Sequence, residues 1–284
     1  MTHVTIVEMS PRDGLQNEKR TVPTADKIRL VDMASACGFE RIEAASFVSP
    51  RWVPQMADAA EVLAGIDRRP GTRYAALTPN EKGLEGAIEA GADEVAIFGS
   101  ASEAFSKANI NCGIAGSLER FAPVVERARK VGLPVRGYIS CVVACPYSGP
   151  VEPSSVADLA GKLLALGCYE VSLGDTIGAG TPDTVGAMLD AVLPRVPAHL
   201  LAGHYHDTNG RALDNIEASL QRGLRVFDAS LGGLGGCPYA PGAKGNVDTI
   251  AVCGRLDRLG YRAGLDPARL AEAAAFARSL RPET

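Results

Sequence analysis

The sequence lacks the features that mark membrane, secreted and nucleic-acid-binding proteins. No run of about eighteen apolar residues occurs, so no membrane-spanning helix is predicted. The first residues show no basic, apolar and small-residue regions in succession, and we expect no signal peptide. The net charge is −4 and no long run of one sign occurs. We therefore expect no nucleic-acid partner and no membrane partner.

The cysteines show no disulfide or metal-binding spacing, and histidine is scarce. The seven cysteines are odd in number and form no Cys-x-x-Cys, so we expect no disulfide framework and a reducing, cytoplasmic location. Of only four histidines, His204 and His206 stand one residue apart at the end of an apolar run. Alternate residues of a strand face the same side, so both imidazoles are expected to project together. The alternative is a strand end with one exposed and one hydrogen-bonded histidine.

Short β-rich runs alternate with helical patterns along the whole chain. Eight strands are predicted, at residues 4–8, 40–44, 74–77, 94–98, 134–140, 169–173, 201–206 and 225–231. Helical spacing is clearest at about 25–37, 153–166 and 210–223. Eight βα units predict an α/β fold, a (β/α)8 TIM barrel formed by residues 1–284 as a single domain. A doubly wound open sheet is the alternative, but the first strand leads into Met-Ser-Pro-Arg-Asp-Gly and not into a glycine-rich phosphate turn.

A barrel of this kind carries its active site at the C-terminal face, just after the strand ends. The most unusual residues of the chain fall at those positions. They are Arg12 and Asp13 after the first strand, Glu43 at the end of the second, Tyr138 near the end of the fifth, Asp175 after the sixth, His204 and His206 at the seventh, and a glycine-rich catalytic loop at about 232–246 after the eighth.

A divalent metal site is predicted among these residues. His204 and His206 offer two nitrogens, and Asp13 would lie beside them because strands one, seven and eight are neighbours in a closed barrel. Asn246 could add an amide oxygen, and this mixed set suits Mg²⁺ or Mn²⁺. Asn246 could instead cap a helix beginning at Val247, and Asp13 could shape an Asp-Gly turn. A cap and a ligand are not mutually exclusive.

Arg12 and Cys237 suggest what such a site would do. A guanidinium beside a metal stabilises an enolate, although Arg12 could also form an ion pair with Glu43 or Asp175. Cys237 lies in the glycine-rich loop, where its thiol could act as general acid or base or could simply be buried beneath the loop. Together these groups predict cleavage of a carbon–carbon bond through an enolate, as in a retro-aldol or retro-Claisen reaction.

Five motifs resemble those of the 3-hydroxy-3-methylglutaryl-CoA (HMG-CoA) lyase family. They are Pro-Arg-Asp-Gly-Leu-Gln-Asn-Glu-Lys at 11–19, Ile-Glu-Ala-Ala-Ser-Phe-Val-Ser-Pro at 42–50, Ser-Leu-Gly-Asp-Thr-Ile-Gly at 172–178, His-Tyr-His-Asp-Thr at 204–208, and Gly-Leu-Gly-Gly-Cys-Pro-Tyr-Ala at 233–240, with Gly245-Asn246 after them. The resemblance spans nearly the whole chain. Arg-Asp-Gly and His-x-His would also fit the related Claisen-condensing synthases, whereas the Gly-Gly-Cys-Pro loop separates the lyases from them.

The resemblance implies a barrel that cleaves HMG-CoA to acetyl-CoA and acetoacetate with Mg²⁺ or Mn²⁺, and it suggests a homodimer. It makes Asp13, His204, His206 and Asn246 the metal ligands, Arg12 the group that stabilises the enolate, and Cys237 the acid that protonates it. Asp13 or His204 would share in removing the C3 hydroxyl proton, while Glu43 and Asp175 hold the arrangement in place. For the acyl pocket it suggests Gln16, Asn109, Tyr138, Ser172 and Thr176, with Lys19 near that pocket or the CoA.

The sequence departs from the family pattern at two positions that are not proposed ligands. Ala45 stands where threonine is usual, and Asn209 where tyrosine is frequent. Both could change the shape of the acyl pocket. The family includes lyases for citramalyl-CoA and longer branched 3-hydroxyglutaryl-CoAs, so these substrates remain alternatives, followed by condensation with a 2-oxo acid. A barrel kept only as a binding module would have lost site residues, and none is missing here.

Overall fold

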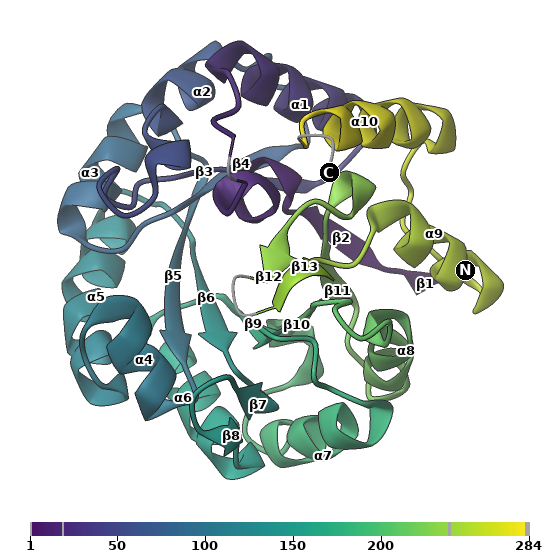
Figure 1. Ribbon diagram of the computed structural model, residues 1–284. Helices are drawn as coiled ribbons and strands as arrows, with labels where there is room; N and C mark the ends of the chain where they lie inside the picture. Colours follow the sequence, from purple (N-terminus) through teal and green to yellow (C-terminus); the bar gives the residue numbers. More distant parts are fainter. Residues whose placement is uncertain (1, 19, 238–239, 282–284) are drawn as a thin grey trace.

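The chain forms a closed barrel of eight parallel strands with helices around it (Figure 1). The computed structural model describes residues 2–18, 20–237 and 240–281, and for residues 236–237 and 240–244 only the backbone. The barrel strands, in their order around the ring, are β10 (Leu201–Tyr205), β11 (Val226–Ala229), β2 (Thr5–Glu8), β3 (Arg41–Ser46), β4 (Arg73–Leu77), β5 (Glu94–Ser100), β6 (Val135–Ser140) and β9 (Glu170–Asp175). All eight predicted strands and the predicted barrel are confirmed, and the first, seventh and eighth strands are neighbours.

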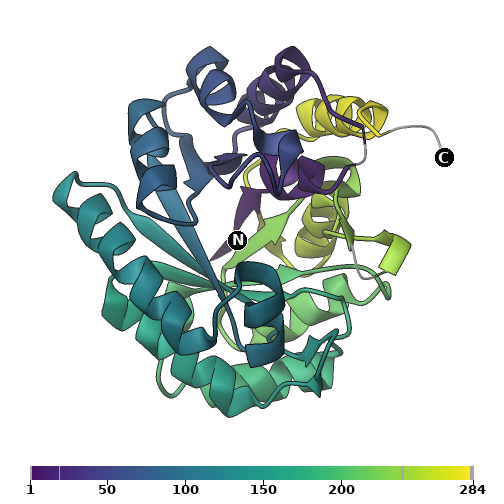
Figure 2. The ribbon, with the colours of Figure 1, turned by 60° about the vertical axis from the view of Figure 1, so that its left-hand side comes forward.

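Helices connect the strands and cover the outside of the barrel (Figures 1 and 2). They are α1 (Thr24–Ala36), α2 (Ala59–Gly65), α3 (Glu81–Glu89), α4 (Glu103–Ile110), α5 (Ile114–Lys130), α6 (Pro153–Leu166), α7 (Pro182–Val192), α8 (Ala212–Gln221), α9 (Thr249–Arg258) and α10 (Pro267–Ser279). The three predicted helices correspond to α1, α6 and α8. Within the described ranges no helix is long and apolar enough to cross a bilayer.

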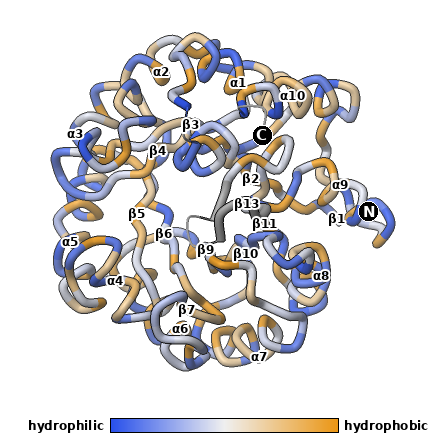
Figure 3. Tube along the Cα trace, in the orientation of Figure 1, coloured by the Kyte–Doolittle hydropathy of each residue, from blue (hydrophilic) through white to orange (hydrophobic). Residues whose placement is uncertain are grey.

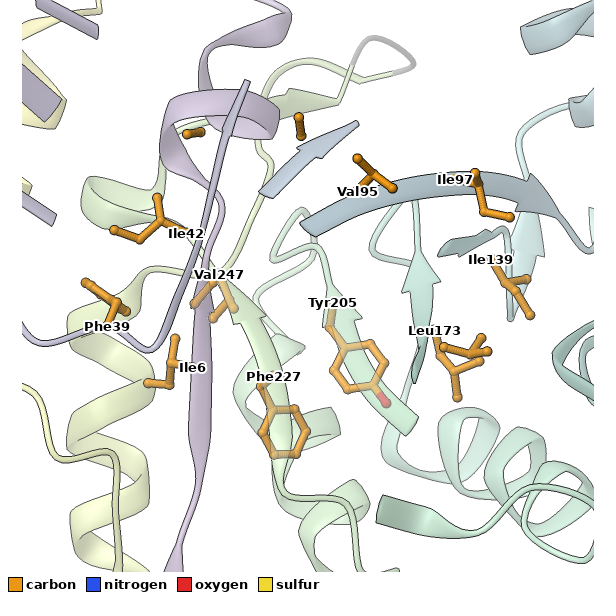
Figure 4. Packing of buried hydrophobic residues seen from close by; sticks show 14 of the residues in the cluster. Ile6, Phe39, Ile42, Val95, Ile97, Ile139, Leu173, Tyr205, Phe227 and Val247 are labelled. Atoms are coloured by element: carbon orange, nitrogen blue, oxygen red, sulfur yellow. The ribbon is translucent and has the colours of Figure 1, made fainter. Parts of the chain in front are cut away.

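The main apolar core lies between the strands and the helices. Outward residues of the strands, such as Ile6, Ile42 and Phe227 (Figure 4), belong to this core. Apolar residues of the helices complete it. Polar and apolar stretches alternate along the outer helices in Figure 3, as expected for helices with one face on the barrel. This layer accounts for most of the buried apolar side chains.

The inside of the barrel is different, because its apolar cluster is small. That cluster contains Val7, Met9, Leu77, Ala96 and Tyr138. Much of the remaining interior is polar and fully buried, with side chains that include Arg41, Glu43, Arg136, Glu170, Ser172 and Asp228. On a strand such as β6, successive residues alternate between the two sides of the sheet. This period of two explains why every second side chain points into the barrel.

The C-terminal face carries short elements that the strand pattern does not predict. After β2 the chain forms the π-helix η1 (Ser10–Gly14), closed by the hydrogen bond from Gly14 N to Met9 O at 3.0 Å. After β11 come the 3-10 turn η4 (Leu231–Gly233) and an antiparallel ribbon of β12 (Gly236–Cys237) and β13 (Ala240–Lys244). A side chain at Gly14 would collide with Leu234, so this glycine lets η1 lie against the glycine-rich loop.

Small strand pairs and turns complete the fold. β1 (Thr2–His3) pairs with β14 (Tyr261–Arg262), and β7 (Ala144–Cys145) pairs with β8 (Gly149–Pro150). The 3-10 turns η2 (Pro54–Met56) and η3 (Ala198–Leu200) lie in connections between barrel elements. None of these elements interrupts the ring of eight strands, so the strand ends form one face on which a site can be built.

Candidate metal centre and catalytic site

The two histidines lie side by side at the end of β10. His204 is in the strand, and His206 immediately follows it in a bridge to Asn246. Each side chain is buried, with only 9% of the residue exposed. Their Nε2 atoms are 3.3 Å apart, so the prediction that both imidazoles face the same way is confirmed.

Asp13 brings a carboxylate to this histidine pair from η1. Its Oδ2 lies 3.8 Å from Nε2 of His204 and 3.9 Å from Nε2 of His206. One possible ligand atom from each of the three residues lies within 4.8 Å of the other two. The backbone of Asp13 lies in the π-helix η1 and not in the simple Asp-Gly turn that was the alternative.

Asn246 joins the same cluster across the glycine-rich loop. Its Nδ2 donates to Oδ2 of Asp13 at 2.7 Å and to the carbonyl of Leu234 at 3.3 Å. Asn246 does not cap the helix that follows, because α9 begins at Thr249 and Asp248 accepts a hydrogen bond from Ala251 N as its cap. Its role as a fourth ligand stays a prediction.

The chemistry of this donor set fits a divalent cation. Two imidazole nitrogens and a carboxylate oxygen converge, and each can donate a lone pair to a shared ion. Burial, reinforced by His204, lowers the pKa of His206 to about 4, so its ring is neutral near pH 7. Burial alone would raise the pKa of Asp13, but the charge of Arg12 and the two histidines outweighs it and lowers that pKa. A neutral imidazole and an ionised carboxylate are the forms that bind metals.

Arg12 lies next to the cluster and is held by two carboxylates. Its Nε donates to Glu43 and its Nη1 to Asp13. Burial opposes its charge, but Glu43 and Asp13 outweigh that effect and raise the pKa of Arg12. Asp175 does not share this ion pair, because its carboxylate accepts from the backbone N–H groups of Ala179 and Gly180 at 3.1 and 2.8 Å. Of the two partners considered for Arg12, the structure therefore selects Glu43.

Tyr138 links Glu43 to the interior of the barrel. Its hydroxyl donates to Oε1 of Glu43 at 3.2 Å and accepts from Nη1 of Arg136 at 2.9 Å. The Arg12 guanidinium lies 5.8 Å from the Tyr138 ring centroid, and the His204 ring meets the same ring edge-on at 6.3 Å. Tyr138 thus lies where the acyl pocket is predicted.

The other predicted pocket residues are placed unequally. Gln16 lies on the segment after η1, and its buried Oε1 has no hydrogen-bond partner among the described residues, as expected for a group that binds substrate. Thr176 accepts from Cys141 N at 2.9 Å, directly after β9. Ser172 is fully buried and donates to Asp228, so it lies beneath the histidines. Asn109 is exposed on α4, and no hydrogen bond among the described residues joins it to the site.

Two predicted residues lie outside what the structure describes. Lys19 is not among the described residues, and for Cys237 only the backbone is described, as part of β12. That backbone pairs with β13 above the strand ends, on the segment that also leads to Asn246. The proposed role of the Cys237 thiol and the position of Lys19 stay predictions.

Sequence reasoning missed the charged residues beneath the histidines. Arg136 contacts both Asp228 and Glu170, and Glu170 also pairs with Arg41. Each of these residues lies in a predicted strand, and each is nearly inaccessible to solvent. A charge in the middle of an otherwise apolar strand was the signal that could have found them.

The fold and the site define a (β/α)8 barrel with a candidate divalent metal centre and a neighbouring arginine at its C-terminal mouth. Residues 3–277 match the HMGL-like family, and the chain belongs to that family. This confirms the resemblance seen in the sequence motifs.

Individual relatives agree with this assignment. Over 270 residues the chain is 58% identical to the 3-hydroxy-3-isohexenylglutaryl-CoA/hydroxy-methylglutaryl-CoA lyase of Pseudomonas aeruginosa, which covers 95% of this chain and 90% of that protein. The crystal structure of the HMG-CoA lyase from Brucella melitensis matches with a TM-score of 0.99 and 65% identity over 100% of both chains. An HMG-CoA lyase from Acinetobacter baumannii in complex with coenzyme A and 3-methylmalate matches with a TM-score of 0.93 and 37% identity, over 98% of this chain and 91% of that one.

Proposed function

We propose that this protein is an HMG-CoA lyase that uses Mg²⁺ or Mn²⁺ to cleave HMG-CoA to acetyl-CoA and acetoacetate. The observation that carries the proposal is the convergence of Asp13, His204 and His206 beside the guanidinium of Arg12. The close identity to lyases named for this substrate supports the choice of acyl-CoA.

The reaction needs a proton removed, a carbon–carbon bond broken and a proton returned. The C3 hydroxyl loses its proton to a base, the C2–C3 bond breaks, and C3 becomes the ketone of acetoacetate. The bonding electrons pass to C2 as the enolate of acetyl-CoA, which then takes up a proton. A bound divalent cation supplies Lewis acidity and a template for the substrate oxygens.

The residues of the chain divide this work between them. Asp13 or His204 shares in removing the C3 hydroxyl proton. Arg12, kept charged by Glu43, stabilises the enolate oxygen through its positive charge. Cys237 returns the proton to C2 from the glycine-rich loop, as general acid. Glu43 and Asp175 act by position, the first on Arg12 and the second on the backbone that follows β9.

Asn246 completes the proposed ligand set, and Gln16, Tyr138 and Thr176 bound the acyl group. The unpartnered Oε1 of Gln16 supports this assignment. We further propose a homodimer in the cytoplasm. The free cysteines among the described residues suit such a reducing compartment.

A longer branched substrate is the second candidate function. It is favoured by the 58% identity to a lyase whose name includes 3-hydroxy-3-isohexenylglutaryl-CoA. The expectation that Ala45 shapes the acyl pocket is wrong, because an irregularity in β3 between Glu43 and Ala45 pairs Ala45 with Ala76, and both belong to the core between strands and helices.

The test is a product assay with HMG-CoA in the presence of Mg²⁺ or Mn²⁺, repeated with EDTA and with Cys237→Ala. We expect release of acetoacetate that EDTA abolishes and that falls by about 10²- to 10⁴-fold in the variant. The same assay with the isohexenyl analogue compares the two substrates through kcat/KM. No cleavage of HMG-CoA by folded, metal-loaded protein contradicts the substrate assignment, and cleavage that survives EDTA contradicts the metal.

A further inference from the structure

His204 has a partner on its inner side that no part of the proposed mechanism uses. Asp228 lies on β11 in register with His204 on β10, so both side chains face the inside of the barrel. The Nδ1 of His204 and the Oδ2 of Asp228 are 3.1 Å apart. Asp228 is only 2% exposed, and its carboxylate therefore meets protein groups and little solvent.

Asp228 is itself held in one orientation. Arg136 donates from Nη2 to Oδ1 at 2.8 Å and from Nη1 to Oδ2 at 3.1 Å, which is the two-point geometry of an arginine–carboxylate pair. Ser172 donates to Oδ2 at 2.8 Å. These contacts leave Asp228 little freedom to turn, and the ring of His204 is fixed by the same contacts.

Arg136 is anchored in turn at the base of the barrel. Its Nε donates to Oε1 of Glu170 at 2.8 Å, and Glu170 receives two further hydrogen bonds from Arg41. The charges therefore form a continuous chain of contacts from the strand starts up to His204. Such a chain is rigid because each member is buried and paired on both sides.

The second histidine has a different kind of partner, because its hydrogen bond is with the backbone at Thr176 and not with a carboxylate. The Nδ1 of His206 is buried and has no side-chain hydrogen-bond partner among the described residues. The two members of the His-x-His pair are therefore inequivalent, although the sequence presents them alike. Among the described residues, only His204 has a carboxylate at its Nδ1, where it fixes the orientation of the ring and its tautomer.

We propose that Asp228 is a positioning residue that holds His204 with its proton on Nδ1 and its Nε2 lone pair directed at Asp13 and His206. This inference rests on the proposed metal site. A carboxylate behind a ligating histidine orients the ring and makes its other nitrogen a stronger donor, and its removal typically weakens metal binding by about 10- to 100-fold. Asp228 contacts the ligand and not the metal, so it tunes affinity from the interior of the barrel.

The experiment compares Asp228→Asn with Glu170→Gln in Mn²⁺ titrations followed by electron paramagnetic resonance. Both substitutions neutralise a buried carboxylate that pairs with Arg136, but only Asp228 touches a histidine. We expect the Kd for Mn²⁺ to rise about 10- to 100-fold in D228N and less than about threefold in E170Q. Equal Kd values for D228N and wild type would overturn the inference, as would an equal rise in both variants.

A measurement on the wild-type protein keeps the test independent of how well D228N folds. Nitrogen-15 spectra of the metal-free protein above pH 8 report the tautomer of each histidine ring. We expect His204 to carry its proton on Nδ1, and a proton on Nε2 instead would overturn the inference. Wild-type protein that binds no Mn²⁺ would sink the proposed metal site itself, and so the two failures are distinguishable.

Discussion

The base of the barrel, where the strands start, and its mouth, where they end, both bury charged side chains. The partners of these side chains differ between the two regions. At the base, Arg41, Arg136 and Glu170 are each paired with opposite charge. At the mouth, lone pairs of Asp13, His204 and His206 face one another across less than 4.8 Å. Paired buried charges satisfy one another, whereas converging lone pairs are satisfied only by a cation or protons.

This difference separates structural from functional burial within one fold. A buried charge is expensive in either place, so burial or a shifted pKa alone does not indicate function. The informative feature is whether the charged group still lacks a partner for its charge or its lone pair. Asp228 stands between the two regions, because it belongs to the paired base and also contacts a histidine of the mouth.

The largest effect is expected from His206→Leu, which changes only the proposed metal site at the mouth. This change removes one proposed ligand and replaces a buried ring whose Nδ1 has no side-chain partner. We expect activity to fall at least about 10³-fold and Mn²⁺ to lose its effect on Tm, since binding a ligand to the native state raises stability. The metal-free variant should unfold at the same temperature as metal-free wild type, or higher. A large loss of metal-free Tm would show that His206 is structural.

A substitution at the base should have the opposite effect, which is a loss of stability in the metal-free protein. Arg136→Met leaves Asp228 and Glu170 buried without their shared cation, and we expect the free energy of unfolding to fall by about 3–5 kcal/mol. Urea denaturation measures this. The matched control is Arg195→Met, which breaks an exposed pair with Asp158 and should cost about 0–1 kcal/mol. Similar losses in the two variants would refute the distinction between paired core charges and surface pairs.

The sequence predicted the mouth better than the base, for a physical reason. Strand periodicity and the rule that barrel chemistry follows strand ends are enough to place Asp13 beside His204 and His206. Arg136 and Asp228 each stand alone within an apolar run, and the pattern does not show which charge on a distant strand each one meets. Their partners depend on strand register, with Arg136 opposite Glu170 and Asp228 opposite His204.

Local backbone geometry was the other feature that the sequence did not predict. Pro-Arg-Asp-Gly is typical of a turn, yet it forms a π-helix because Gly14 donates to Met9 and packs against Leu234. Likewise Asn246 and Asp248 are both good caps, and only the start of α9 at Thr249 decides between them. The contact between Gly14 and Leu234 joins segments more than 200 residues apart, which a local pattern does not show.

A smaller effect, which depends on pH, is expected at Glu8, another buried carboxylate. Burial raises its pKa to about 7 from an ordinary value of 4.5, although Ser10 N, Leu231 N and Thr249 Oγ1 all donate to it. A folded pKa above the unfolded one means that this group stabilises the fold below about pH 4.5 and that the contribution is lost as pH rises through about 7.

We therefore expect Glu8→Gln to remove this pH dependence while keeping an acceptor for the two backbone donors. Between pH 5 and 8 the free energy of unfolding of wild type should fall by up to about 3 kcal/mol relative to the variant. Urea denaturation at several pH values measures the difference. Parallel profiles for wild type and E8Q would mean that Glu8 titrates normally.

The smallest effect is expected at Arg281, which connects the C-terminal helix to the mouth. Its Nη2 donates to the carbonyls of Gly233 and Gly235, and its Nε lies 3.4 Å from Glu18. Gly233 and Gly235 both have positive φ, so a turn that glycine makes possible leads into the segment carrying Cys237. Arg281 thus restrains the backbone of this loop at Gly233 and Gly235.

Arg281→Ala should lower kcat by about two- to tenfold, the scale of one or two hydrogen bonds of about 1 kcal/mol each. Arg269→Ala is the matched control, because Arg269 lies on α10, the helix that precedes Arg281, but donates to Ala36, away from the loop. Limited proteolysis should cut the loop faster in R281A than in R269A. Unlike R136M, R281A should leave the free energy of unfolding nearly unchanged, because it releases a loop at the mouth and leaves the paired charges at the base intact. Equal kcat and equal cleavage rates in R281A and R269A would show that the loop holds its position without the C-terminal arginine.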